Sequence, residues 1–224
     1  MNYINNKYEQ YYDRNGFKYI VEVGARDALD SISLANHFPN AQVYSYEANP
    51  EQCSICQNNI ANSIVADRIV FNNYGLGHEV GSFEFYPYVC NNVGCSSFLK
   101  RIDFADAQKV LPQCVAIHKL IDDMKQNNVP YIDLLCMDVQ GYELNILKGC
   151  DEYIRKIKYV IMEVPNSVIN LQFLPKDTYS KYIGAPDPHI IIDYMKSIGF
   201  EEVVRIAENA IEDNVMYRNT NFIC

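Results

Sequence analysis

Two segments near the N-terminus carry the residue types and the spacing of a nucleotide site. Residues 19–27 are a short apolar run ending in a turn at Gly24, where a helix would open, and residues 43–50 are a second apolar run that ends at Glu47. Glu47 follows Gly24 at roughly the 20-residue spacing at which a nucleotide-binding βαβ unit places a carboxylate on a ribose. The two segments therefore predict a site for an adenosine-containing cofactor.

Polar residues close four of the predicted strands: Glu22 with Gly24, then Glu47, Asp138 and Glu163. Taken singly, each acid is explained equally well as a helix cap or a solvated loop carboxylate. Ligands of open α/β sheets bind beyond the carboxyl ends of the strands, so such residues on four strands predict one functional rim. Asp138 and Glu163 would end adjacent central strands, where they could share a proton-accepting or metal-binding role.

The elements that must position these residues alternate along the chain. Strands are predicted at residues 17–23, 42–46, 69–73, 82–88, 114–117, 131–137 and 159–164, with a closing pair at 200–206 and 215–223, and helices at 4–12, 28–38, 50–61, 120–127, 142–149 and 190–198. This alternation predicts an α/β fold with one doubly wound, Rossmann-like sheet, mostly parallel with an antiparallel closing strand. We expect a single domain over residues 1–224, with an N-terminal helix within residues 1–16 and a candidate acceptor lid at residues 166–189.

Composition narrows the class of protein. The 224 residues carry a formal net charge of −9 without a basic cluster, which disfavours nucleic acid as a partner. Apolar runs fall short of the ~20 residues that span a bilayer, and the N-terminus lacks the apolar core of a signal peptide. We therefore expect a soluble, cytoplasmic protein without a membrane span, whose eight cysteines are reduced. The tyrosine-rich N-terminal helix could pack on its own sheet or on a second subunit, which leaves a homo-oligomer open.

Six segments resemble, in their order along the chain, the FkbM-type methyltransferases, a branch of the Rossmann-like class I enzymes that depend on S-adenosylmethionine. They are residues 21–27, 38–50, 73–77, 94–98, 132–149 and 160–163. The order and spacing of the set carry the resemblance, because each motif alone is short. The chain departs from the family pattern at four positions: Cys136 stands where lysine is usual, Gln140 where glutamate is usual, Tyr142 where a small residue is usual, and Arg26 where asparagine is frequent.

The resemblance implies S-adenosylmethionine as cofactor, and the residue types suit its chemistry. A carboxylate at Glu47 accepts two hydrogen bonds from a ribose diol, and Gly24 lets the chain pass close to the ligand. Backbone N–H groups near Asp27 could receive the methionine carboxylate, with Glu22 and Asp138 near the ammonium and sulfonium charges. The expected cofactor-binding set is Glu22, Gly24, Ala25, Arg26, Asp27, Glu47, Ala48, Asn49, Asn73 (at the edge of the adenine), Gly75, Ser97 and Asp138.

The resemblance also implies O-methylation of a small hydroxylated acceptor, such as a sugar or a glycan terminus. Methyl transfer requires an acceptor oxygen held about 3 Å from the methyl carbon, and a base or a divalent metal that assists loss of the proton. The candidate catalytic residues are Asp138, Glu163, His118 and His189, and Asp138 and Glu163 are also the candidate metal ligands. For both histidines, the sequence favours a surface or hydrogen-bonded structural role over that of a base. Tyr86, Tyr88, Tyr142, Tyr179 and Tyr182 fall in or near loops that could line an acceptor pocket.

Two other functions remain compatible with the sequence. An NAD-dependent oxidoreductase would use Gly24 and Glu47 in the same way, although the first loop has a single glycine and the motif at residues 138–143 has no place in that class. A catalytically inactive binding module of the same fold would explain the departures at Cys136 and Gln140.

Overall fold

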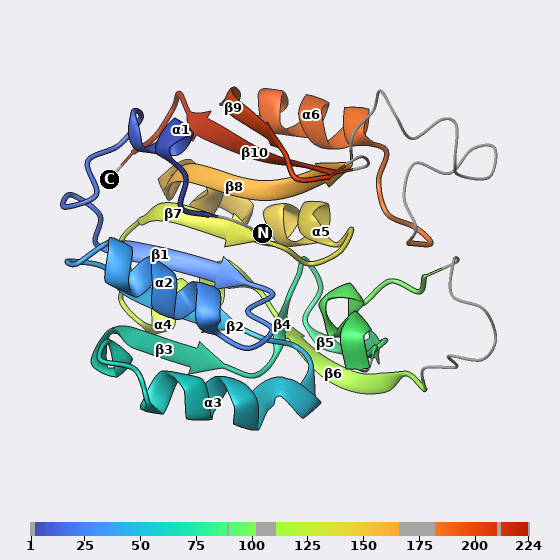
Figure 1. Ribbon diagram of the computed structural model, residues 1–224. Helices are drawn as coiled ribbons and strands as arrows, with labels where there is room; N and C mark the ends of the chain where they lie inside the picture. The colour runs from blue at the N-terminus through green and yellow to red at the C-terminus, as the bar shows by residue number, and fades with distance from the viewer. Residues whose placement is uncertain (1–2, 89, 102–110, 166–181, 210–211, 224) are drawn as a thin grey trace.

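The structure is a computed structural model that describes residues 3–88, 90–101, 111–165, 182–209 and 212–223 (Figure 1). Most of the candidate lid, residues 166–181, and Tyr179 within it therefore lie outside the described residues. Among the described residues, no helix has both the length and the apolar character needed to cross a membrane.

A seven-stranded sheet forms the centre of the molecule, in the order β3-β2-β1-β7-β8-β10-β9. Its strands are β1 (Tyr19–Val23), β2 (Gln42–Tyr46), β3 (Ile69–Asn72), β7 (Ile132–Met137), β8 (Ile157–Pro165), β9 (Phe200–Ala207) and β10 (Glu212–Asn219). The five strands from β3 to β8 pair in parallel, and β10 is antiparallel to both of its neighbours, β8 and β9. The predicted mostly parallel sheet with an antiparallel closing strand is confirmed.

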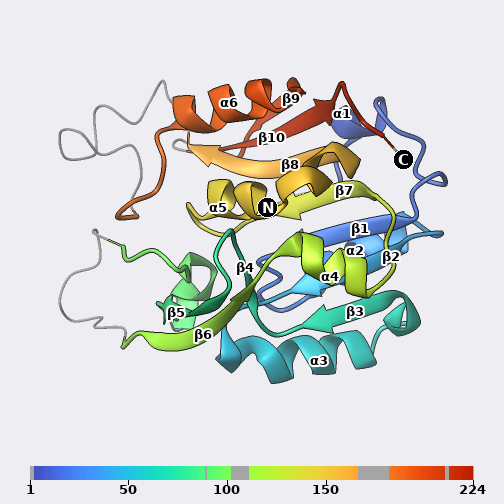
Figure 2. The same cartoon turned by 180° about the vertical axis from the view of Figure 1, so that it is seen from behind.

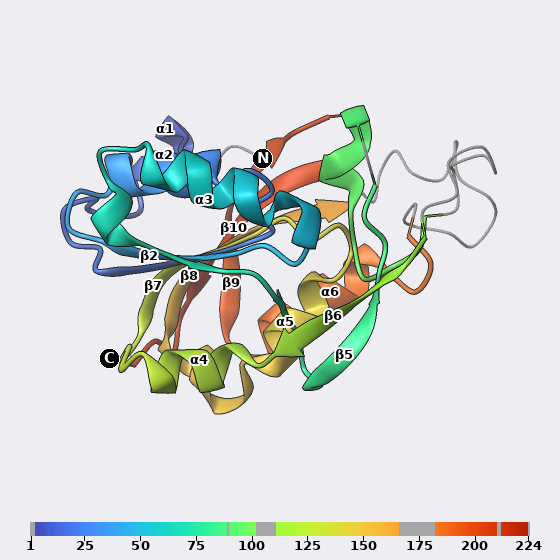
Figure 3. The same ribbon diagram turned by 90° about the horizontal axis from the view of Figure 1, so that it is seen from below.

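Helices cover both faces of this sheet, as the view from below shows (Figure 3). One face carries α1 (Asn6–Glu9), α2 (Leu29–His37) and α3 (Cys53–Ala61), and the other carries α4 (Leu120–Gln126), α5 (Glu143–Gly149) and α6 (Pro188–Ser197) (Figures 1 and 2). The short 3-10 helices are η1 (Pro50–Gln52), η2 (Ala66–Arg68), η3 (Cys90–Cys95) and η5 (Asp151–Lys156). Each face has its own buried apolar cluster, which is the arrangement expected of a doubly wound sheet.

Strand β7 shows why the sheet centre is a continuous apolar run. All of its residues are buried, because helices cover it on both faces. Its one acid, Asp133, is compensated at its buried position: its Oδ2 accepts hydrogen bonds from the backbone N–H groups of Lys18, at 2.6 Å, and Tyr19, at 3.1 Å. The carboxylate thereby joins the start of β1 to the centre of the sheet.

Two of the predicted strands do not belong to the main sheet. The segments expected at residues 82–88 and 114–117 form β5 (Gly81–Phe85) and β6 (Gln113–His118), which join β4 (Gly75–Leu76) in a separate three-stranded sheet of order β4-β6-β5. The expectation of one sheet was therefore wrong for these strands. Most residues of β5 are exposed or half-exposed, a pattern suited to a sheet with one wet face rather than to a parallel sheet covered on both.

Glycines allow the small sheet to pack closely against its neighbours, α5 among them. A Cβ at Gly149 would lie 2.0 Å from the carbonyl oxygen of Gly77, and a Cβ at Gly75 would lie 2.5 Å from the ring of Phe98. These close approaches bring the small sheet beside the carboxyl ends of the main-sheet strands (Figures 1 and 3).

The N-terminal helix is shorter than predicted, four residues in place of residues 4–12. The chain turns onto the sheet after it, because the Tyr159 hydroxyl donates to the Tyr11 carbonyl at 2.6 Å and the Tyr11 hydroxyl donates to the Val203 carbonyl at 3.1 Å. The C-terminal strand β10 lies three residues earlier than predicted at its start and ends at Asn219 rather than at residue 223.

Candidate functional site

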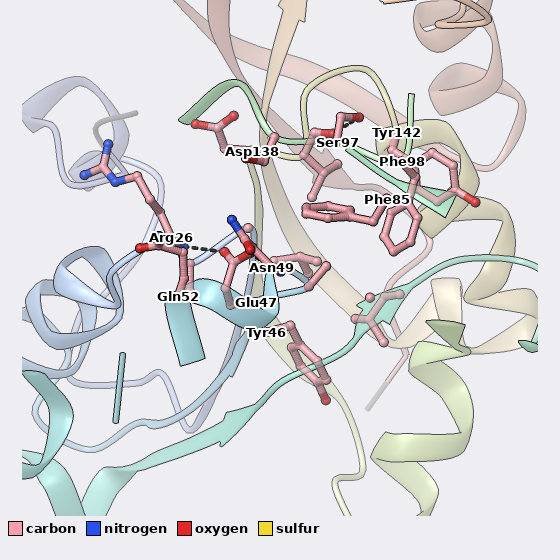
Figure 4. A pocket seen from close by; sticks show the side chains of 18 of the residues that line it. Arg26, Tyr46, Glu47, Asn49, Gln52, Phe85, Ser97, Phe98, Asp138 and Tyr142 are labelled. Carbon is pink, nitrogen blue, oxygen red and sulfur yellow. Dashed lines mark hydrogen bonds between the residues drawn. The ribbon is translucent and has the colours of Figure 1, made fainter. Parts of the chain in front are cut away.

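A cavity of about 810 Å³, including its open mouth, lies at the carboxyl ends of β1, β2 and β7 (Figure 4). It extends from the loop after β1 to the aromatic side chains of the small sheet. The lining includes nine of the twelve residues predicted to bind the cofactor: Gly24, Ala25, Arg26, Glu47, Ala48, Asn49, Gly75, Ser97 and Asp138. The fold therefore gathers residues of five sequence segments around one space.

The Glu47 carboxylate is fixed between the two predicted cofactor loops. Its Oε2 accepts a hydrogen bond from the Arg26 backbone N–H and its Oε1 accepts one from the Asn49 backbone N–H, each at 2.6 Å. The side chain is 6% exposed, and this burial raises the pKa of the carboxyl, whereas the two N–H groups favour its charged form. Each oxygen retains a further acceptor site for a ligand.

Asn49, on the cavity lining, has a buried Nδ2 without a hydrogen-bond partner among the described residues. The Asn49 side chain is oriented by its other end, because Oδ1 accepts a hydrogen bond from the Glu51 backbone N–H at 3.0 Å. An unsatisfied buried polar group costs about 1–3 kcal/mol. A ligand that offers acceptors beside Glu47 would remove this cost (Figure 4).

Gly24 is required by the protein itself. It has a φ of +90°, and a Cβ there would lie 2.0 Å from the carbonyl oxygen of Asp138. The Asp138 N–H in turn donates to the Val23 carbonyl at 3.0 Å, which continues the pairing of β1 with β7 past the strand ends. The prediction placed Gly24 beneath a ligand, and the structure adds that the end of β7 occupies the space of its side chain.

Asp138 and Glu163 are brought together through a third side chain, Gln140. Gln140 Nε2 donates to Asp138 Oδ1 at 2.6 Å and to Glu163 Oε2 at 3.1 Å. Burial, followed by the nearby charge of Asp138, raises the pKa of Glu163. Burial also raises the pKa of Asp138, against the lowering effect of the Gln140 hydrogen bond. Asp138 lines the large cavity, and Glu163 lines a second cavity of about 350 Å³ on the other side of Gln140.

The family follows from a comparison with known sequences. The sequence model of the methyltransferase FkbM domain matches residues 22–202. This chain belongs to the FkbM methyltransferase family. The resemblance expected from the ordered motifs is thereby confirmed.

This FkbM methyltransferase is similar over most of its length to a 2-O-methyltransferase. The 2-O-methyltransferase NoeI of Sinorhizobium fredii (strain NBRC 101917 / NGR234) is 23% identical over 210 residues, which cover 90% of this chain and 79% of that protein.

Solved structures share the fold at low identity. A putative O-methyltransferase from Klebsiella pneumoniae is 11% identical with a TM-score of 0.55, over 92% of this chain and 74% of that one. A putative tRNA methyltransferase from Streptococcus pneumoniae, in complex with S-adenosyl-L-methionine, is 8% identical with a TM-score of 0.52, over 94% of this chain and 70% of that one. These likenesses support the class I methyltransferase fold.

The lining of the large cavity fits S-adenosylmethionine, the cofactor of this methyltransferase class. The free acceptor sites of Glu47 and the unpartnered Nδ2 of Asn49 suit a ribose, which both donates and accepts hydrogen bonds. Asp30 and Asp138 add carboxylates on the lining that suit an ammonium and a sulfonium. The phenyl rings of Phe85 and Phe98 give one end of the cavity an apolar surface (Figure 4).

Three residues of the expected cofactor set do not line this cavity. Glu22 is buried behind it, where the Ser31 hydroxyl donates to its carboxylate. Asp27 Oδ1 accepts a hydrogen bond from the Leu29 N–H, at 3.2 Å, at the start of α2. Asn73 Nδ2 donates to the Glu47 carbonyl at 2.8 Å and thereby holds the second cofactor loop. The side chains of these three residues make hydrogen bonds within the protein, near the loops that line the cavity.

Neither candidate histidine lines either cavity. The His118 ring stacks on Tyr74 with centroids 4.2 Å apart, and its Nδ1 lies 3.8 Å from an oxygen of Asp123. These contacts draw it to the α4 side of β6. His189 is exposed in the first turn of α6, where its N–H donates to Asp187 Oδ1 at 2.8 Å. The structure therefore does not bring these imidazoles to Asp138 and Glu163.

The described residues hold no cluster of three or more histidine, cysteine, aspartate or glutamate side chains suited to a metal ion. The predicted pair of metal ligands, Asp138 and Glu163, instead shares an amide nitrogen that brings hydrogens rather than a lone pair. The donor set present around this pair does not fit a divalent metal.

Sequence reasoning missed the aromatic end of the cavity, apart from Tyr142. Phe98 lies between Phe85 and Tyr142, with ring centroids 5.0 and 5.2 Å apart. Tyr3 also lines the cavity and is 3% exposed, although it precedes the first strand. The only local signal was the pair of glycines at Gly75 and Gly77, which permits the close approach of these rings.

Proposed function

We propose that this chain transfers the methyl group of S-adenosylmethionine to a hydroxyl of a small acceptor, such as a sugar or a glycan terminus. The observation that carries the proposal is the Glu47 carboxylate, held by two backbone N–H groups beside the unpartnered Nδ2 of Asn49. Glu47 and Asn49 supply hydrogen-bond acceptors and a donor at the end of β2, where nucleotide-binding folds of this kind bind a ribose.

The chain's own residues divide the work of the reaction between them. Glu47 and Asn49 bind and orient the nucleoside part of the cofactor. When bound, S-adenosylmethionine supplies a methyl group activated by its sulfonium charge. Asp138, on the cavity lining, gives that region a negative potential that favours a cation. The main contribution of the protein is the alignment of the two reactants.

The acceptor hydroxyl must lose its proton, and we assign its removal to the carboxylates of Asp138 and Glu163. Glu163 Oε2 faces Gln140 and lines the second cavity, together with Tyr182. We assign the second cavity to the acceptor, since it adjoins Asp138 through Gln140. The name of NoeI, a 2-O-methyltransferase, supports oxygen as the methylated atom, and Tyr182 offers an aromatic face that suits a sugar ring.

Membership of the FkbM family favours methyl transfer over the alternative of hydride transfer with NAD. An inactive binding module would bind the cofactor without turnover. We also propose that residues 1–224 form one methyltransferase domain.

Calorimetric titration with S-adenosylhomocysteine tests the proposal, with NAD as the control ligand. We expect micromolar binding of S-adenosylhomocysteine and none of NAD. Glu47→Ala should weaken that binding by about 100-fold, since it removes charge-assisted hydrogen bonds worth about 1.5–3 kcal/mol. The exposed Glu79→Ala is the matched control. Unchanged affinity in Glu47→Ala would refute the ribose assignment, and binding of NAD alone would refute the proposed cofactor.

A screen of acceptors follows, with release of S-adenosylhomocysteine as the readout and free sugars as the first set. Cofactor binding without turnover on any acceptor would favour the inactive module.

A further inference from the structure

The Gln140 amide occupies the space between two carboxylates of neighbouring strands. Its Nε2 lies 2.6 Å from Asp138 Oδ1 and 3.1 Å from Glu163 Oε2, so each amide hydrogen has an acceptor. Asp138 follows β7 and Glu163 lies in β8, which pairs with β7 in parallel. The residue stands in a turn with a φ of 55°, a left-handed conformation that is uncommon for a residue with a side chain.

The surroundings of the Gln140 amide favour one of its two orientations. The Tyr182 hydroxyl lies 2.7 Å from Gln140 Oε1 and 2.9 Å from the Cys95 carbonyl oxygen, and these two acceptors share its one proton. The Ser97 hydroxyl donates to the Gln140 backbone carbonyl at 3.0 Å and holds the turn. A flipped amide would direct Oε1 at two carboxylates, which is electrostatically unfavourable. The –NH₂ group is therefore held between Asp138 and Glu163.

Two carboxylates that converge on one point from adjacent strands are a usual arrangement for a hard divalent cation, which prefers oxygen ligands. Here the point of convergence is taken by an amide nitrogen, which cannot ligate a metal through its hydrogens.

We propose that Gln140 takes the place of a bridging divalent cation, so that the chain holds Asp138 and Glu163 by hydrogen bonds and turns over without a metal. Gln140 is then a positioning residue for the two carboxylates. The role of Asp138 and Glu163 in turnover rests on the proposed function. The hydrogen bonds of Gln140 to these two carboxylates do not depend on that function.

Calorimetric titration with Mn²⁺ tests whether Gln140 takes the place of a cation. This experiment needs no acceptor substrate. Gln140→Glu should create a three-carboxylate site and bind one Mn²⁺ at least tenfold more tightly than the unmodified chain. Gln57→Glu, on the exposed face of α3, adds the same charge elsewhere and should behave as the unmodified chain. A thermal melt confirms that each variant is folded.

Two results would overturn the proposal. One is a folded Gln140→Glu that binds Mn²⁺ no more tightly than Gln57→Glu. The other is stoichiometric Mn²⁺ binding by the unmodified chain that Glu163→Gln abolishes, and this test stands even if Gln140→Glu does not fold.

Turnover tests the positioning role, once an acceptor is found. Gln140→Ala and Gln140→Glu should each lower kcat at least tenfold, with the Kd of S-adenosylhomocysteine within threefold of the unmodified value. Mn²⁺ should restore Gln140→Glu and leave Gln140→Ala inactive, a rescue that a merely structural role would not produce. Equal response of both variants to Mn²⁺ would refute it. If the unmodified chain does not bind S-adenosylhomocysteine, the proposed function fails while the Mn²⁺ titration still tests Gln140.

Discussion

The proposed cofactor side and the proposed acceptor side of the site are built by different kinds of contact. On the cofactor side, Glu47 is held by backbone N–H groups that lie 21 residues before it and two residues after it. On the acceptor side, Asp138 and Glu163 are held by the side chain of Gln140, which depends on Tyr182 in turn. Backbone contacts persist when neighbouring side chains change, whereas side-chain contacts do not. We therefore expect the acceptor side to tolerate less substitution around its carboxylates.

The largest effect is expected where the two sides touch, at Gly24. Gly24→Ala places a Cβ against the Asp138 carbonyl, in a left-handed conformation, and should lower the free energy of unfolding by about 3 kcal/mol or more. Urea unfolding measures the loss. The control is Gly184→Ala, because Gly184 also has a positive φ but its nearest atom to a Cβ is 4.0 Å away. That variant should lose about 1 kcal/mol. Equal losses would show that the approach of the two strands is not the constraint.

A second prediction concerns Glu22, behind the cofactor loops. Burial raises the pKa of its carboxyl to about 8, whereas in the unfolded chain the value is about 4.3. Between these values the folded state holds a proton that the unfolded state has lost, so stability decreases as pH rises. Glu22→Gln has no such proton.

The advantage of Glu22→Gln over the unmodified chain should therefore grow from pH 5 to pH 8, by roughly 3–4 kcal/mol in the free energy of unfolding. Urea unfolding across this range gives the measurement, with the exposed Glu79→Gln as the control. A difference that stays constant with pH would contradict the buried, protonated state of Glu22.

Asn49→Asp tests the contribution of the Asn49 amide to cofactor binding. The variant keeps an oxygen for the Glu51 N–H but loses the unpartnered Nδ2 donor of the cavity. We expect about tenfold weaker binding of S-adenosylhomocysteine, since a hydrogen bond to a ligand contributes about 1 kcal/mol and a second carboxylate repels Glu47. Calorimetry measures it, with Asn58→Asp on the exposed face of α3 as the control. Affinity equal to that of the control would remove Asn49 from the binding set.

The smallest effect is expected from Tyr182→Phe on the acceptor side. It removes the hydroxyl that orients the Gln140 amide and keeps the ring. We expect kcat to fall about threefold, with binding of S-adenosylhomocysteine unchanged, as for loss of one neutral hydrogen bond. Steady-state kinetics gives the split, and Tyr86→Phe, whose hydroxyl donates to the exposed Glu84, is the matched control. A loss of cofactor affinity instead would mean that the two sides are not separable.

The cofactor side was largely predictable from the sequence, because its parts are local. The apolar runs before Gly24 and Glu47 form β1 and β2 near their predicted bounds, and the loops after them meet since the strands pair directly. Asn49, predicted to bind the cofactor, lines the cavity for the same reason. The role of Asn73 differs, because its amide turns back to the Glu47 carbonyl.

The sequence by itself determined which segments become strands and helices, the family, and the loops that follow β1 and β2. Periodicity, glycine turns and motif spacing are properties of neighbouring residues, so they can be read along the chain. The tertiary structure decided that β5 and β6 form a second sheet, and that Phe85 and Phe98 close the cavity. It also decided that Gln140 bridges two carboxylates, because its partners lie up to 42 residues away and only the folded chain brings them within hydrogen-bond distance.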